Sequence, residues 1–342
     1  MAGRGTKITM AHVNPKSQYW ALAALVLGAV AIAFAGIFAK DAARLGYMGE
    51  LAVGFWRFAF AVPVLLLAMF ILPKRTQSLP AECSMNPIWL LLPGVLFACD
   101  IGFWHFALSY TTVSNSTLLA NVQVFIVGFF GWLLLKERIK TTYLIGLLIA
   151  SGGTWVLLTN GVKQDYAPNP ALGDGLSLAV AFWYASYLLL VKVLRRDFRT
   201  IEILLATCAV AAAILFIAAI VHGERFTPVY KSRSLGTTVE DYQRAWTSLV
   251  LLALIPQCIG QGLITWGISR LPASFSALVL LLQPVCAAFL GWYMLSEILN
   301  NWQIAASGAI IIGIVLAKLG TQSTSDDPAV GSDPPGTPGD SS

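Results

Sequence analysis

Residues 109–137 read SYTTVSNSTLLANVQVFIVGFFGWLLLKE, and residues 269–297 read SRLPASFSALVLLLQPVCAAFLGWYMLSE. A shift of 160 positions aligns the two stretches without a gap and matches 10 of 29 residues. The small and polar matches carry the most weight, because apolar residues agree more easily by chance. They are Ser109 with Ser269, Ser114 with Ser274, Ser116 with Ser276, Gln123 with Gln283, Gly131 with Gly291, Trp132 with Trp292 and Glu137 with Glu297. The pattern indicates an internal duplication.

The composition is that of an integral membrane protein. Of 342 residues, 57% are hydrophobic and only 11% are charged, against about 25% charged in soluble domains. The net charge is +5, but the Lys and Arg residues lie between apolar runs instead of on one basic face, so we expect no nucleic-acid partner. Five cysteines without metal-ligand spacing predict neither a disulfide framework nor a metal site.

Ten apolar segments are long enough to cross a bilayer, which takes about 20 residues. They are Tyr19–Ala39, Leu51–Leu72, Ile88–Leu108, Ser114–Leu135, Tyr143–Thr159, Gly173–Val191, Ile201–Val221, Trp246–Ile268, Phe275–Leu295 and Trp302–Leu319. The predicted fold class is an all-α membrane protein with ten transmembrane helices.

The duplication divides the chain into two units of five helices. The predicted parts are an N-terminal arm (1–18), a first repeat (19–160), an external linker (161–172), a second repeat (173–319) and a disordered tail (320–342). With the N-terminus inside, 14 Lys and Arg residues face the cytoplasm and 7 face outward. The positive-inside rule therefore predicts both termini in the cytoplasm and a location in the inner or plasma membrane.

The two repeats are predicted to be inverted. The offset of 160 residues spans five helices, an odd number, so the fourth helix enters the membrane from outside and the ninth from inside. Inverted repeats are the construction of many secondary transporters, in which similar halves move about a site at the midplane and expose it alternately. The duplication therefore favours transport over a channel or a membrane enzyme.

The same residues resemble the drug/metabolite transporter superfamily, specifically its EamA-type members with five plus five helices. The fourth helix begins in Ala-Leu-x-Tyr-Thr (107–111) and ends in Gly-Trp-Leu-Leu-Leu-Lys-Glu-Arg (131–138). The ninth begins in Pro-Ala-Ser (272–274) and ends in Leu-Ser-Glu (295–297), and Phe-Trp-Arg-Phe (55–58) is similar to the family's helix-two arginine. The resemblance covers about residues 19–319.

The resemblance implies an alternating-access carrier that exports metabolites such as amino acids, or drugs. An uptake carrier or facilitator for a small metabolite is the alternative. The chain departs from the family at one position: Pro284 in the ninth helix keeps the family's mid-helix proline, whereas its partner is Val124. A bend in the fourth helix is therefore expected to come from Gly128 or from packing.

Two charges lie within the predicted membrane spans, where an uncompensated charge costs about 2.5 to 3.5 kcal/mol. Arg57 and Asp100 fall at similar depths on adjacent antiparallel helices, and we predict that they pair across a central cavity. One interpretation is a substrate clamp in which Arg57 binds a carboxylate and Asp100 couples to a proton or cation. The other is a structural ion pair.

Uncharged polar and aromatic residues supply the other cavity candidates, with interhelical packing as the alternative role. They are Trp104, Thr117, Asn121, Trp183, Tyr184, Gln257, Gln261 and Gln283. His105 lies about 140° around the helix from Asp100. It is either a proton relay or an interfacial histidine beside Trp104.

Two further features are assigned to packing. Small residues recur every four positions at Gly146, Ala150 and Thr154 and again at Ala309, Gly313 and Ala317. These stripes predict either close helix packing within one chain or a face that pairs two copies of it. Glu137 and Glu297, at the ends of the repeated helices, are predicted to cap helices or to belong to hinge loops.

The other classes of protein lack support in the sequence. No H-E-x-x-H, G-x-S-x-G or P-loop motif is present, so we expect neither an enzyme nor a cofactor. A channel would need a continuous polar stripe, and a scaffold would be expected to add a folded extramembrane domain. The expected partners are a small-molecule substrate, the lipid bilayer and, if the small stripes pair two chains, a second copy.

Overall fold

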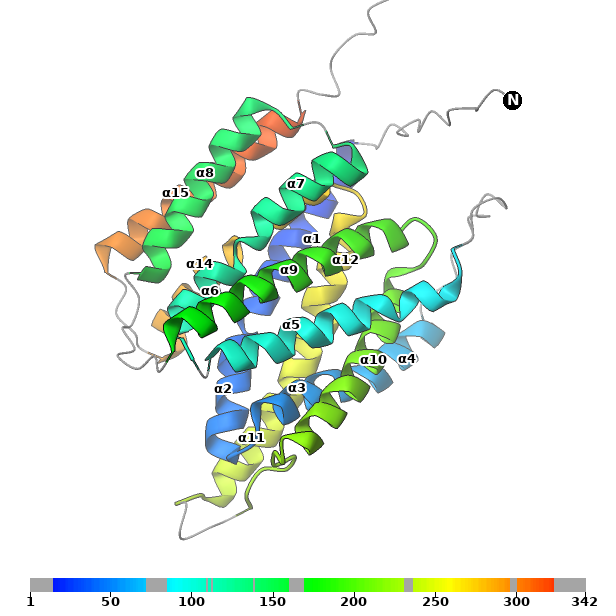
Figure 1. Ribbon diagram of the computed structural model, residues 1–342, viewed down its shortest axis with the longest axis vertical. Helices are drawn as coiled ribbons and strands as arrows, with labels where there is room; N and C mark the ends of the chain where they lie inside the picture. Colours follow the sequence, from blue (N-terminus) through cyan, green and yellow to red (C-terminus); the bar gives the residue numbers. More distant parts are fainter. Residues whose placement is uncertain are drawn as a thin grey trace, which may run out of the picture.

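The computed structural model describes residues 15–71, 85–108, 110–111, 113–137, 139–159, 169–230, 236–295 and 300–322, and it is a bundle of helices (Figure 1). The first repeat contributes α1 (Pro15–Ala33), α2 (Ala35–Gly46), α3 (Glu50–Ala59), α4 (Ala61–Ile71), η1 (Pro87–Leu90), α5 (Leu92–Leu108), α6 (Val113–Ala120), α7 (Gln123–Leu135) and α8 (Thr141–Thr159). The second contributes α9 (Pro170–Leu194), α10 (Thr200–Val221), α11 (Val239–Leu252), η2 (Ala253–Gly260), α12 (Gln261–Ile268), α13 (Ala273–Val279), α14 (Leu282–Leu295) and α15 (Asn301–Gln322). The predicted tail beyond 322 lies outside the described residues.

Ten spans in the described ranges are long and apolar enough to cross a membrane, which confirms the predicted fold class. The predicted ends were wrong for two of them. The first span runs over Ser17–Gly46 and the eighth over Val239–Ile268, each 30 residues long. Their extensions, α2 and the start of α11, contain charges that the apolar pattern excluded, and the structure pairs those charges: Arg244 Nη2 lies 3.0 Å from the Asp41 carboxylate. The connection between the seventh and eighth spans is correspondingly shorter than the predicted segments imply, because α11 begins at Val239.

The helix contacts follow the symmetry of an inverted repeat. The third span (α5) packs on the sixth (α9), and the equivalent pair in the other half, the eighth (η2, α12) and the first (α1), also packs together. Three more pairs join equivalent spans directly: α3 and α4 with α10, α7 with α13, and α8 with α15. Each contact thus maps onto itself or onto a second contact when the halves are exchanged.

α8 and α15 lie side by side along their lengths (Figure 1). The small residues that recur every four positions on these two helices allow this close contact. A Cβ atom added to Gly313 would come within 2.6 Å of the Ala150 nitrogen and of the Gly146 carbonyl oxygen. Only glycine permits this approach of the two backbones. Close packing within one chain is therefore the role of the stripes in this structure.

Both repeated helices are interrupted at equivalent places. The fourth span breaks between α6 and α7 at Asn121–Val122, and the ninth breaks between α13 and α14 at Leu280–Leu281. At each break a backbone N–H bonds three residues back instead of four. Pro284 has no N–H to donate and so accounts for the second break.

Of the two expected sources of a bend in the fourth span, Gly128 and packing, Gly128 is excluded, because it lies inside the continuous helix α7. Asn121 is the residue at the break: its side-chain Nδ2 donates to the Thr117 carbonyl at 2.8 Å, and this carbonyl also accepts the Asn121 backbone N–H at 3.1 Å. A side-chain amide that bonds the backbone competes with the helical ladder and favours a local distortion.

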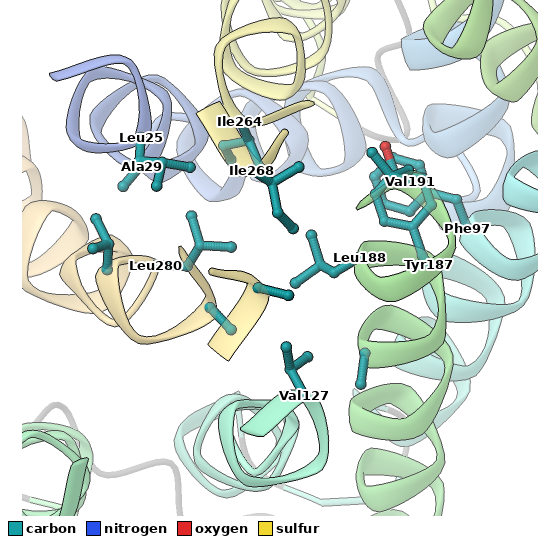
Figure 2. Packing of buried hydrophobic residues seen from close by; sticks show 14 of the residues in the cluster. Leu25, Ala29, Phe97, Val127, Tyr187, Leu188, Val191, Ile264, Ile268 and Leu280 are labelled. Carbon is teal, nitrogen blue, oxygen red and sulfur yellow. The ribbon is translucent and has the colours of Figure 1, made fainter. Parts of the chain in front are cut away.

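The core lies where the two repeats meet. Figure 2 shows Leu188 and Val191 of α9 facing Ile264 and Ile268 of α12, with Leu25 and Ala29 of α1 and Val127 of α7 around them. Leu280, at the break of the ninth span, belongs to the same cluster. The buried cluster brings both interrupted helices next to α9, which carries the aromatic residues of the site.

Candidate functional site

Arg57, on α3, is bonded to the opposite half of the chain. Its Nε donates to Gln257 Oε1 at 2.9 Å, and Gln257, which is completely buried, donates in turn to Cys208 Sγ at 3.4 Å. Among the described residues, no other hydrogen bond is formed by this guanidinium. A guanidinium has five N–H donors, so most of its donors are free for a ligand.

Gln257 reaches Arg57 from an irregular turn. It lies in η2, a π-helical segment that contains Pro256. A proline inside a helix removes one backbone hydrogen bond and clashes with the preceding turn, and a widened turn relieves that clash. Single π turns of this kind recur at functional sites, and here the turn carries the glutamine that holds the arginine.

Asp100, on α5, is 8% exposed and lies near enough to Arg57 for Coulombic attraction. The predicted direct pair is nevertheless absent: Arg57 and Asp100 form no ion pair with each other, whereas His105 pairs with Glu50 and Arg244 with Asp41. The prediction was wrong in that respect because depth along a helix fixes only height in the membrane. The glutamine in the π turn takes the position facing Arg57 Nε.

Aromatic rings form a wall beside these charges. Phe97 of α5 stacks on Tyr187 of α9 with ring centroids 4.8 Å apart, as Figure 2 shows, and Tyr187 stacks on Tyr184 at 5.9 Å. The Arg57 guanidinium carbon lies 5.6 Å from the Phe58 ring and 5.7 Å from the Phe97 ring. These distances are within the range of cation–π attraction.

Two buried amide atoms near the wall have no hydrogen-bond partner among the described residues. Tyr184 lies beside the side chains of Gln261 and Gln283, and Tyr187 beside that of Thr265. Among the described residues of this region, Gln261 Oε1 and Gln283 Nε2 have no hydrogen-bond partner, whereas the Tyr187 hydroxyl and Thr265 Oγ1 lie next to each other. Most buried polar atoms in proteins are bonded, so these two amide atoms are available to a polar ligand.

The structure therefore gathers six of the sequence candidates in one place: Arg57, Asp100, Tyr184, Gln257, Gln261 and Gln283. Its residues come from the second, third, sixth, eighth and ninth spans. Both repeats contribute to it.

Other candidates lie elsewhere or make local bonds. The Asn121 amide bonds the Thr117 carbonyl within its own helix. Trp183 contacts Phe103 and the exposed Phe182.

His105 lies in the last turn of α5. Its Nδ1 is 2.6 Å from Glu50 Oε2, and its ring meets Trp104 edge-on at 5.3 Å. The bond to Glu50 was not predicted.

Sequence reasoning missed four residues of the site: Phe58, Phe97, Tyr187 and Thr265. Two of them had a usable signal, since Tyr187 follows Tyr184 by three residues and Thr265 follows Gln261 by four, so each shares a helix face with a candidate. The phenylalanines had none, because nothing distinguishes them from lipid-facing residues in sequence.

A bundle of ten spans, built from two repeats around buried polar residues, is a construction found in many membrane transporters. Residues 19–159 and 171–319 both match the EamA-like transporter family. The chain belongs to this family and is a multi-pass membrane transporter.

Curated relatives agree with this assignment. The chain is 25% identical over 267 residues to the uncharacterized transporter YetK of Bacillus subtilis, covering 77% of this chain and 76% of the relative. It is 25% identical over 276 residues to the uncharacterized transporter YwfM of the same organism, covering 79% and 82%. A crystal structure with 20% sequence identity shares the fold, with a TM-score of 0.68 over 89% of this chain and 98% of its own.

Proposed function

We propose that this transporter is an alternating-access carrier that exports small, amino-acid-like metabolites. The observation that carries the proposal is that an arginine and an aspartate, Arg57 and Asp100, both lie within the helical bundle without forming an ion pair with each other. Each buried charge is costly unless it is paired. A ligand that carries both a carboxylate and an ammonium group satisfies both.

The surroundings support the same chemistry. The free donors of Arg57 suit a carboxylate, which a guanidinium binds through two parallel hydrogen bonds. Asp100 suits an ammonium group, the stacked rings of Phe97, Tyr187 and Tyr184 suit an apolar side chain, and the free amide of Gln261 suits a hydrogen-bonding one. A substrate with a single charge would leave one of the two protein charges without a partner.

The architecture supports alternating access. The fourth and ninth spans, which are equivalent in the repeat, are both interrupted, and helices of this kind form the sites of other inverted-repeat carriers. Export is favoured by the family resemblance, with uptake or facilitated passage of a metabolite as the alternative. Coupling to protons through Asp100, with His105 and Glu50 at the outer end, belongs to the same proposal.

The test compares one substrate with its two singly charged analogues. Purified protein is screened for thermal stabilisation by phenylalanine and leucine, by the amines that lack the carboxylate, and by the acids that lack the amino group. We expect stabilisation by the zwitterions alone. The variant Asp100→Asn should lose the preference for an ammonium group, and Arg57→Gln the preference for a carboxylate.

A different result would point to another substrate class. Equal stabilisation by all three compounds, or stabilisation only by uncharged aromatic drugs, contradicts the amino-acid-like substrate and favours a drug exporter. Unchanged preferences in both variants would contradict the assignment of Arg57 and Asp100.

A further inference from the structure

The turn between the eighth and ninth spans, residues 269–272, is held from both sides by charged residues of other spans. We call this arrangement the turn clamp; it consists of Glu137, Tyr143 and Lys192 with the ends of α12 and α13. The Glu137 carboxylate accepts the backbone N–H of Ala273 at 2.5 Å and that of Ser274 at 3.1 Å, and the Ser274 hydroxyl donates to it at 2.6 Å.

Lys192 holds the other side of the same turn. Its Nζ donates to the carbonyl of Ile268 at 2.7 Å and to that of Leu271. The last carbonyls of one helix and the first N–H groups of the next have no partners within their helices. The Lys192 cation at the end of α12 and the Glu137 anion at the start of α13 therefore satisfy these backbone groups. Each charge also complements the dipole of the helix end that it contacts.

The bonds of the clamp are shielded from solvent. Glu137 is 9% exposed and Ser274 is 3% exposed, and the Tyr143 hydroxyl donates to the Ser274 carbonyl at 3.1 Å. Charge-assisted hydrogen bonds of this kind are about twice as strong as neutral ones. They join the fourth and fifth spans of one repeat to the ninth span of the other.

Residues that are matched in the duplication gather at the clamp. Three of the small or polar matches, at Gly131, Glu137 and Ser274, belong to it. A Cβ atom on Gly131 would come within 3.0 Å of Glu137 Oε2, so glycine leaves room for the carboxylate. The prediction that Glu137 caps a helix is confirmed, and the helix it caps belongs to the opposite repeat; Glu297 lies outside the described residues.

We propose that the turn clamp keeps this end of the transport pathway closed and that Glu137 is the positioning residue whose bonds break when the end opens. The inference rests on the proposed alternating-access function. In such a cycle the two repeats must separate at one end while they meet at the other. The clamp is a buried, polar and breakable connection between them at one end.

The experiment measures the opening directly and needs no substrate. Spin labels are placed at Thr141, the exposed first residue of α8, and at Ser269 in the clamped turn, and the distance distribution is recorded in the full-length protein. We expect one short distance in the parent protein. Glu137→Gln should add a second, longer population, and Ser274→Ala should add a smaller one because it removes a single bond.

Glu202→Gln is the matched control. Glu202 also caps a helix with its carboxylate, but it bonds the backbone of Arg199 three residues away, at the start of the same helix. It should leave the distance distribution unchanged. If Glu137 had a merely structural role, Glu137→Gln would lower the melting temperature without adding a population with a longer distance between the labels.

A single short distance in both folded clamp variants would overturn the proposal, and Ser274→Ala keeps it testable if Glu137→Gln does not fold. The failure of the clamp and the failure of the proposed carrier function can be told apart. A longer population in a protein that exchanges no solute would support the clamp and count against the carrier, whereas solute exchange with unchanged distances would do the reverse.

Discussion

Arg57 shows how a buried charge is placed by residues far away in the sequence. Its acceptor, Gln257, is 200 positions later and belongs to the other repeat. The sequence predicted that both residues line the interior, because a charge and an amide in apolar helices seldom face lipid. It did not predict their contact, because the π turn changes the direction in which Gln257 points.

Substitution of Gln257 separates its structural role from that of Gln261. Gln257→Leu leaves the Arg57 guanidinium without its acceptor, so we expect a loss of about 1.5 to 3 kcal/mol in unfolding free energy. Gln261→Leu removes a side chain that is 1% exposed and whose Oε1 has no partner. It should cost little stability but weaken substrate binding.

Thermal unfolding in detergent and substrate titration of both variants check this prediction. Equal destabilisation by the two substitutions would contradict the different roles of these glutamines.

At the level of elements, the interrupted fourth span shows two routes to the same distortion. The ninth span uses Pro284, and the fourth uses the Asn121 side chain bonded to Thr117. The sequence indicated a missing proline but not its substitute, because an asparagine within a helix bonds its own backbone in some contexts and neighbouring helices in others.

Exchange of one route for the other tests their equivalence. Asn121→Leu places in the fourth span the leucine that the ninth span has at Leu281, but without the proline that the ninth span has at Pro284. We therefore expect a continuous helix and reduced transport. The double variant Asn121→Leu/Val124→Pro copies the second repeat and should recover transport. Initial rates in vesicles with matched protein amounts provide the measurement; an unaffected Asn121→Leu would contradict the role of the break.

The contact of α8 with α15 predicts a stability difference between two glycines of one helix. Gly313→Ala forces a methyl group against the α8 backbone, and overpacking of this kind costs about 1 to 3 kcal/mol. Gly308→Ala meets no atom within 4 Å and should be neutral or slightly stabilising because alanine favours the helix. The melting temperatures of the two variants measure this difference in stability, and equal values would contradict close packing at Gly313.

At the scale of the whole molecule, the architecture was predictable because the duplication and the apolar segments constrain it together. The sequence shows ten apolar segments, a repeat offset that spans five of them, and matched residues such as Ser274 and Glu137. The contacts between the halves were not predictable, because neither the depth of a residue in the membrane nor the composition of a helix fixes how helices rotate and cross. The turn clamp belongs to this second group.

The orientation of the bundle is a separate prediction. Because 14 basic residues lie on the side of the termini against 7 on the other, we expect both ends of the chain in the cytoplasm. A green fluorescent protein fused to the C-terminus should then fluoresce, and an alkaline phosphatase fused there should stay inactive. An active phosphatase with a dark fluorescent fusion would reverse the orientation.

Counterflow in proteoliposomes tests the central claim, that the two repeats form an alternating-access carrier, most directly. Vesicles loaded with an unlabelled zwitterionic metabolite are diluted into a trace of the labelled compound, and its entry is followed. The account predicts saturable entry that accelerates with the internal substrate and is lost in Arg57→Gln. Entry that is linear in concentration and indifferent to the internal solute would contradict it and indicate a channel.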